Sequence, residues 1–134
     1  MIGLKDASMT STSGGSARSA VTVLLVDDHP LVRDGVAHIL TDGGLHVVGQ
    51  ASSLAEGMRL ADAVRADVMV VDVSLGDGSG LDLVTTVRAK RPTMGIVVLT
   101  MYAGDDQLFG ALEAGASAFV PKNAGSRIGT MLIA

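Results

Sequence analysis

The sequence predicts a doubly wound α/β fold, because short apolar runs alternate along the chain with segments of helical periodicity. The apolar runs have the length of strands and contain few polar residues, which is typical of parallel strands that helices cover on both faces. They lie at 21–26, 45–51, 68–71, 95–99 and 117–120. A helical segment follows each run. Strand and helix repeated five times favour a flavodoxin-like (βα)5 fold with a parallel five-stranded sheet and right-handed crossovers.

The composition is that of one globular domain. The chain has 134 residues, enough for one core, and 48% of them are apolar. No apolar run approaches the roughly 20 residues of a membrane span, so we expect no membrane contact. The absence of cysteine excludes disulfides and thiolate metal sites. The net charge is −4 without a basic cluster, so the chain lacks the electrostatic footprint of a nucleic-acid-binding protein.

The N-terminal segment differs from the rest in composition. Residues 1–20 are rich in Ser, Thr and Gly, and we expect a disordered leader there, with the folded domain comprising residues 21–134. This segment lacks the charged region and apolar core of a secretory signal. A cytoplasmic location is therefore expected.

The first two helices have clear start signals. Pro30 suits the first turn of a helix, where its missing N–H costs nothing, and the Asp-Gly-Gly of 42–44 ends that helix. Ser53-x-x-Glu56 has the pattern of a capping box at the start of the second helix. The apolar residues at helical spacing are Val32, Val36, Ile39 and Leu40 in the first helix, and Leu54, Met58, Ala61 and Val64 in the second.

The later helices are predicted at 81–90, from Asp105 to Gly115, and weakly at 123–134. In the helix 81–90 we expect Leu81, Val84 and Val87 to face inward, and in the next helix the periodic residues are Leu108, Leu112 and Ala114. The last segment is short and contains two glycines, which weaken a helix.

Polar side chains follow four of the five predicted strands. Asp27 and Asp28 end the first strand, Asp72 the central one, Thr100 the fourth and Lys122 the fifth. Ligands bind at the carboxyl ends of parallel strands, so these groups are expected to meet there. Taken alone, Asp72 could equally be a cap for the turn that follows it.

The three carboxylates indicate a cation site. At a separation of ~5 Å and an effective dielectric constant of ~20, each pair costs about 3 kcal/mol. A divalent ion would relieve that repulsion, and hard oxygen ligands suit Mg²⁺. A phosphoryl group could then approach Asp72 and form an aspartyl phosphate. Thr100 would donate to one phosphoryl oxygen and Lys122 would pair with another.

These residues carry a resemblance to a known family. The segments VDDHPLVRDGV, VVDVSLGDGSGLDLV and ALEAGASAFVPK resemble receiver domains of two-component response regulators, in particular the NarL/LuxR-type subgroup with a helix-turn-helix output domain. The resemblance covers about 21–123. It implies a phospho-acceptor domain, phosphorylated by a sensor histidine kinase, that controls a transcriptional output rather than acting as an enzyme. DNA would be bound only through an output domain that is absent from this chain, and a homodimer is allowed.

The resemblance also assigns roles to single residues. It implies phosphorylation of Asp72, with Mg²⁺ held by Asp28, by Asp72 and by the backbone carbonyl of Ser74, while Asp27 reaches the ion through water. Phe119 matches the switch aromatic of the family. Gly80, eight residues after Asp72, also fits the family's loop.

Other features depart from the family or stay open. Gly76 replaces a common proline, which should loosen the loop after Asp72. Leu31 lies off the buried stripe of its helix and is either an ordinary surface residue or part of a kinase-docking face. The three histidines, His29, His38 and His46, lack metal-ligand spacing, so surface or structural roles are expected.

Two alternative functions remain. The first is an interaction domain on the same fold that does not depend on phosphorylation, against which the full set of aspartate, threonine and lysine argues. The second is an aspartyl-phosphate hydrolase of the haloacid-dehalogenase type. Such enzymes need an acid two residues after the nucleophile, where this chain has Ser74.

Overall fold

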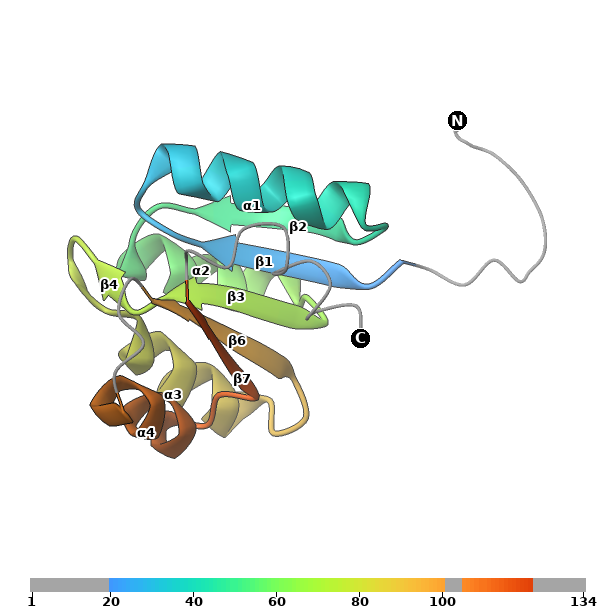
Figure 1. The fold of residues 1–134 in the computed structure, drawn as a ribbon. Helices are drawn as coiled ribbons and strands as arrows, with labels where there is room; N and C mark the ends of the chain where they lie inside the picture. Colours follow the sequence, from blue (N-terminus) through green and yellow to red (C-terminus); the bar gives the residue numbers. More distant parts are fainter. Residues whose placement is uncertain (1–19, 101–104, 122–134) are drawn as a thin grey trace.

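The computed structural model describes residues 20–100 and 105–121. Within them, five parallel strands form one sheet in the order β2-β1-β3-β6-β7, with β3 at its centre (Figure 1). The predicted parallel sheet is thereby confirmed. In chain order the elements are β1 (Thr22–Val26), α1 (Pro30–Asp42), β2 (His46–Ala51), α2 (Leu54–Val64), β3 (Val68–Asp72), β4 (Ser74–Leu75), β5 (Gly78–Ser79), α3 (Gly80–Lys90), β6 (Gly95–Thr100), α4 (Asp105–Ala114) and β7 (Ala118–Pro121).

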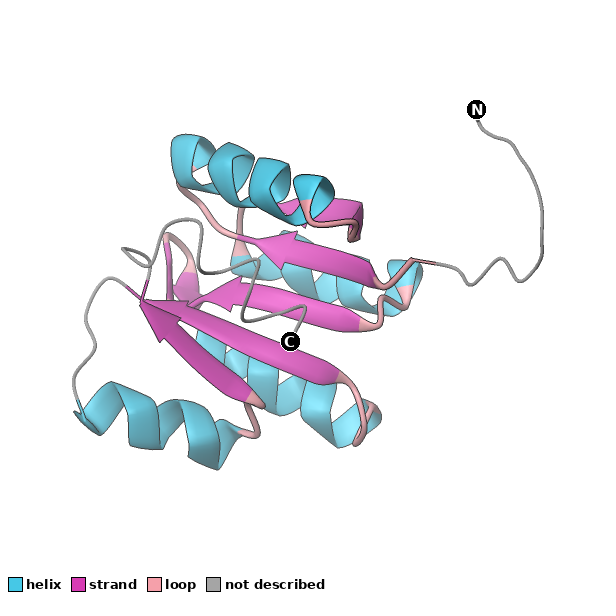
Figure 2. Ribbon diagram, turned by 45° about the vertical axis from the view of Figure 1, so that its right-hand side comes forward, coloured by secondary structure: helices cyan, strands magenta, loops and turns pink. Residues whose placement is uncertain are grey.

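The helices lie on both faces of the sheet, as expected for a doubly wound fold (Figure 2). One core cluster joins the sheet to α2, α3 and α4, with Ala61, Val84 and Ala111 among its buried residues. A second cluster joins the opposite face to α1 through Val36 and Leu40. Because both faces are covered, β1 and β3 are apolar at consecutive positions instead of alternating.

The start of α2 shows how local sequence fixes an element. The hydroxyl oxygen of Ser53 accepts a hydrogen bond from the backbone N–H of Glu56 at 3.1 Å, as the capping pattern predicts. A full capping box would also have the Glu56 carboxylate accept from the N–H of Ser53. It accepts from the N–H of Ser52 instead, at 2.7 Å. The helix therefore begins where the sequence indicates, with one contact displaced by a residue.

Three details of the predicted helices and strands were wrong. The sequence does not place Leu83 on the inward face of α3, but Leu83 is fully buried, because it fills space beside Gly57 of α2. Leu112 is 49% exposed, and Ala111 takes the buried position of α4. Pro121 belongs to β7 rather than following it. Of the leader predicted at 1–20 the structure describes only residue 20, and the helix predicted at 123–134 lies outside the described residues.

Candidate functional site

Two buried carboxylates lie next to each other at the carboxyl edge of the sheet. The neighbouring strands β1 and β3 pair Val26 with Val71, so the residues that follow, Asp27 and Asp72, come side by side. Asp27 is 0% exposed and Asp72 is 1% exposed. Asp28 is half-buried and lies at the same place. We refer to Asp27, Asp28 and Asp72 as the carboxylate cluster.

The ring of His29 lies against the carboxylate cluster. Nδ1 of His29 lies 3.0 Å from Oδ1 of Asp28 and 3.2 Å from Oδ1 of Asp27. The distance from the same nitrogen to Oδ2 of Asp72 is 3.6 Å. The sequence predicted a surface or structural role for His29, and half of its side chain is exposed. Its ring also lies among the three carboxylates, which the sequence did not indicate.

Backbone groups fix the orientation of the carboxylates. The N–H of His29 donates to Oδ1 of Asp27 at 2.8 Å, and the N–H of Ser74 donates to Oδ1 of Asp72 at 3.2 Å. The guanidinium of Arg33 donates to the backbone carbonyl of Asp27 at 2.8 Å, which ties the loop after β1 to α1. These contacts hold the cluster through the main chain, so its shape depends on the ends of β1 and β3.

The donor set of the cluster fits a divalent metal ion. One ligand atom each from Asp27, Asp28, His29 and Asp72 can be chosen so that all lie within 4.8 Å of one another. Carboxylate oxygens are the usual protein ligands of Mg²⁺ and Ca²⁺. Three aspartates so close together repel one another unless a cation lies between them.

Two further predicted residues lie on neighbouring strands. Asp72 of β3 pairs with Leu99 of β6, which puts Thr100 one residue beyond, at the same edge of the sheet and only 3% exposed. Phe119 of β7 pairs with Val98 and packs half-buried against the larger core cluster. Since side chains alternate along a strand, Thr100 and Val98 share one face of β6, the face on which Phe119 packs.

Of the two remaining predicted residues, the structure describes only Leu31. Lys122 lies outside the described residues. Leu31 is 87% exposed in the first turn of α1, two residues after His29. It therefore lies near the rim of the cluster without contributing a ligand atom.

The loop after Asp72 is held at its far end by Asp77. The two carboxylate oxygens of Asp77 accept hydrogen bonds from the backbone N–H groups of Leu54, at 2.7 Å, and Ala55, at 3.0 Å. These bonds, the one from Leu54 first, lower the pKa of Asp77 below its ordinary value. Asp77 thus supplies a cap for α2 from the loop that contains Ser74. Nothing in the sequence indicates this contact, because Asp77 and Leu54 are 23 residues apart.

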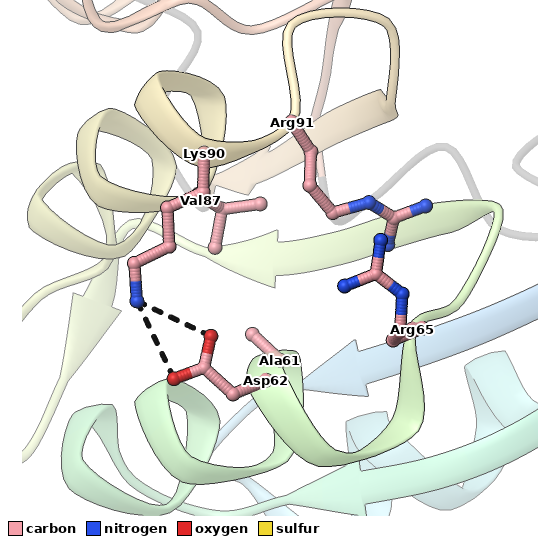
Figure 3. A pocket seen from close by; sticks show the side chains of 6 residues that line it. All are labelled: Ala61, Asp62, Arg65, Val87, Lys90 and Arg91. Carbon is pink, nitrogen blue, oxygen red and sulfur yellow. Dashed lines mark hydrogen bonds and ion pairs between the residues drawn. The ribbon is translucent and has the colours of Figure 1, made fainter.

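A pocket lies at the other end of the strands (Figure 3). It is lined by Ala61, Asp62, Arg65, Val87, Lys90 and Arg91, at the carboxyl ends of α2 and α3. Lys90 pairs with Asp62 at 3.2 Å, and Arg91 donates to the backbone carbonyl of Ala66 at 2.6 Å. Because Arg65 precedes β3 whereas Asp72 ends it, this pocket is separate from the carboxylate cluster.

The comparisons with known proteins agree on one family. Residues 23–131 match the family model described as the response regulator receiver domain. The DNA-binding transcriptional activator DevR/DosR of Mycobacterium tuberculosis is 43% identical over 104 residues, which cover 77% of this chain and 48% of that protein. The chain spans about half the length of the curated relatives it matches.

Solved structures agree with this match. The signal receiver domain of NarL from Mycobacterium tuberculosis superposes with a TM-score of 0.81 at 27% identity, covering 87% of this chain and 95% of that one. A response regulator from Burkholderia pseudomallei, with a phosphorylated aspartic acid, a calcium ion and citrate, has a TM-score of 0.76 at 31% identity. That match covers 85% of this chain and 65% of the other.

Within the described residues, no helix is both long and apolar enough to span a membrane.

Proposed function

Because this chain belongs to the family of response regulator receiver domains, we propose that Asp72 is its phosphorylation site and that a sensor histidine kinase supplies the phosphoryl group. Two-component receiver domains are phosphorylated on an aspartate as their general mechanism. Such domains are signalling modules rather than true enzymes.

The observation that carries the proposal is the position of Asp72. It ends the central strand β3, its side chain is almost completely buried, and two further aspartates lie beside it. The N–H of Ser74 holds one oxygen, Oδ1, and Oδ2 lies toward His29 on the half-exposed side of the cluster. Asp27 is equally buried, and its Oδ1 accepts an equivalent bond from the N–H of His29, so these contacts do not separate the two residues. The position of Asp72 at the end of the central strand favours it as the nucleophile.

The reaction is a transfer between a donor imidazole and a carboxylate. An oxygen of Asp72 attacks the phosphorus of the kinase phosphohistidine, and an O–P bond forms as the P–N bond breaks. The donor nitrogen keeps the electron pair of that bond. The product is an aspartyl phosphate on Asp72 and a free histidine on the kinase.

We assign Mg²⁺ to the carboxylate cluster. Asp28, Asp72 and the backbone carbonyl of Ser74 would hold the ion, with Asp27 bound through water. When bound, the ion neutralises charge on the cluster and on the phosphoryl oxygens. Mg²⁺ fits this site because the three carboxylates lie within reach of one another.

Thr100, Lys122 and Phe119 are proposed to respond to the phosphoryl group. Thr100 ends the strand next to Asp72, so its hydroxyl can donate to a phosphoryl oxygen, and Lys122 would pair with another oxygen. Movement of Thr100 would open space on the face of the sheet where Phe119 packs. The aromatic ring could then turn inward and change the surface around α4.

The partners of the domain are proposed from the surface near the cluster and from the family resemblance. The exposed Leu31 beside the cluster is assigned to a kinase-docking face. A transcriptional output through a DNA-binding domain, an optional homodimer and a cytoplasmic location are proposed from the resemblance to NarL/LuxR-type regulators.

The test is phosphorylation by a small donor. Acetyl phosphate with Mg²⁺ should add one phosphoryl group to the intact protein by mass, and Asp72→Asn should add none. Asp34→Asn is a matched control, because Asp34 is an exposed aspartate of α1 outside the cluster. If Asp72→Asn were phosphorylated as fully as the native protein, the assignment of Asp72 as the phosphorylation site would be wrong. Steady turnover of phosphate monoesters would favour a hydrolase instead.

A further inference from the structure

We propose that His29 adds a nitrogen ligand to the carboxylate cluster, so that this site takes transition-series divalent ions such as Co²⁺ and Zn²⁺ with His29 bound, and takes Mg²⁺ only with His29 displaced. This inference deepens the proposed metal site and rests on it. It does not depend on the phosphorylation of Asp72.

The first support is the position of the ring nitrogen. Nδ1 of His29 lies within 3.6 Å of one oxygen from each of the three aspartates. A carboxylate can only accept a hydrogen bond, so Nδ1 bonds to these oxygens only in the tautomer with the proton on Nδ1. The nitrogen therefore lies at the centre of the carboxylates, where a cation would be attracted by all three.

The second support is how the backbone presents the ring. His29 precedes Pro30, which disfavours the helical conformation, and its backbone is extended with φ −97° and ψ 105°. Its N–H is bound to Oδ1 of Asp27. The Cα of His29 is thus fixed against the cluster, and only side-chain rotation is left to decide whether the ring is in or out.

The third support is the exposure of the His29 side chain. The side chain of His29 is 54% exposed, whereas those of Asp27 and Asp72 are 0% and 2% exposed. The ring therefore lies at the mouth of the cluster and can turn outward without breaking the core.

The chemistry of the ligands then separates the two kinds of ion. Mg²⁺ prefers oxygen and keeps several of its waters, so it gains little from an imidazole. Co²⁺ and Zn²⁺ bind imidazole nitrogen readily. For these ions the Nδ1 lone pair becomes the ligand and the ring proton moves to Nε2. For Mg²⁺ the inward ring is an obstacle.

The experiment compares two metals on three variants of the full chain. Mg²⁺ and Co²⁺ are titrated separately into the native protein, His29→Ala, Asp28→Asn and the control His38→Ala. His38 is an exposed histidine of α1 that pairs with Asp42 at 3.3 Å, away from the cluster. Calorimetry gives the affinities, the visible absorption of Co²⁺ reports nitrogen ligation, and ¹⁵N spectra of the His29 ring report the ligand atom.

The expected result is opposite for the two ions. His29→Ala should weaken Co²⁺ binding by at least the ~10–100-fold typical for loss of a supporting metal contact, change the Co²⁺ spectrum, and leave Mg²⁺ affinity equal or higher. His38→Ala should match the native protein. Unchanged Co²⁺ affinity in His29→Ala, while Asp28→Asn loses both ions, would overturn the role of His29 alone. Full retention of both ions by Asp28→Asn would overturn the proposed metal site itself.

Discussion

Gly80 lies so close to the backbone of Asp72 that a Cβ added to it would overlap the Asp72 carbonyl oxygen. The N–H of Gly80 also donates to the carbonyl of Val73 at 2.7 Å. The start of α3 therefore packs directly on the end of β3. The carboxylate of Asp72 is positioned by this contact as well as by its own strand.

Gly80→Ala is expected to destabilise the domain. The atom that a methyl group would meet is backbone and cannot move away without shifting the end of β3, so we expect a loss of about 1–3 kcal/mol. Gly35→Ala is the matched control, because Gly35 lies in α1 with no atom near an added Cβ, and it should be stabilising by roughly 0.5–1 kcal/mol. Urea unfolding of both variants measures this. Equal stability of the two would contradict the close packing.

Asp77 is expected to make the start of α2 sensitive to acid. Its pKa is lowered by hydrogen bonds from the N–H of Leu54 and of Ala55. A carboxyl with a lowered folded pKa stabilises the folded state above its unfolded pKa, near 3.8, and loses that effect as the pH falls through the lower folded value. Amide exchange at Leu54 and Ala55 should therefore speed up in Asp77→Ala at neutral pH.

The native protein should show the same loss of protection only below about pH 4. Asp82→Ala is a suitable control, since Asp82 is an exposed aspartate in the first turn of α3. If Asp77→Ala exchanged at the native rate, the loop after Asp72 would not be anchored through this residue.

Phosphorylation is expected to change the surroundings of Phe119 only incompletely. A shift from 1:99 to 99:1 between two states needs ~5.5 kcal/mol. A charge-assisted hydrogen bond from Thr100 provides about 1.5–3 kcal/mol. Burial of a phenylalanine ring provides another ~1.5–3 kcal/mol. The sum reaches the required energy only at its upper end, so part of the active state should exist before phosphorylation.

NMR spectra with and without beryllofluoride, which mimics the phosphoryl group, measure this coupling. The Phe119 ring and the amides of 105–115 should shift, and Thr100→Ala should reduce the shifts. The control Asp34→Asn should show the same shifts as the native protein. Unchanged shifts at saturating beryllofluoride would exclude the proposed coupling between Thr100 and Phe119.

The sequence predicted most of the sheet because its signals are local. The runs ending at Val26, Val71 and Leu99 are apolar at every position, and strand ends in a parallel sheet meet at one edge. The juxtaposition of Asp27 with Asp72 followed from that rule. The short hairpin of β4 and β5 was missed, because strands of two residues have no readable periodicity.

Contacts between distant elements could not be predicted in the same way. Nothing in the spacing of His29 indicates that its ring turns toward Asp72, because this depends on how β1 and β3 are paired. Leu83 likewise became a core residue because Gly57 leaves space for it on the next helix. Each of these features is decided by a neighbour far along the chain.

Asp72 is the residue that we propose carries the phosphoryl group. Treatment of the phosphorylated protein with borohydride reduces an aspartyl phosphate to homoserine, and peptide mass spectrometry then identifies the modified position. We predict homoserine at position 72 and unmodified aspartate at positions 27 and 28. Homoserine at 27 or 28, with Asp72 unchanged, would contradict the account.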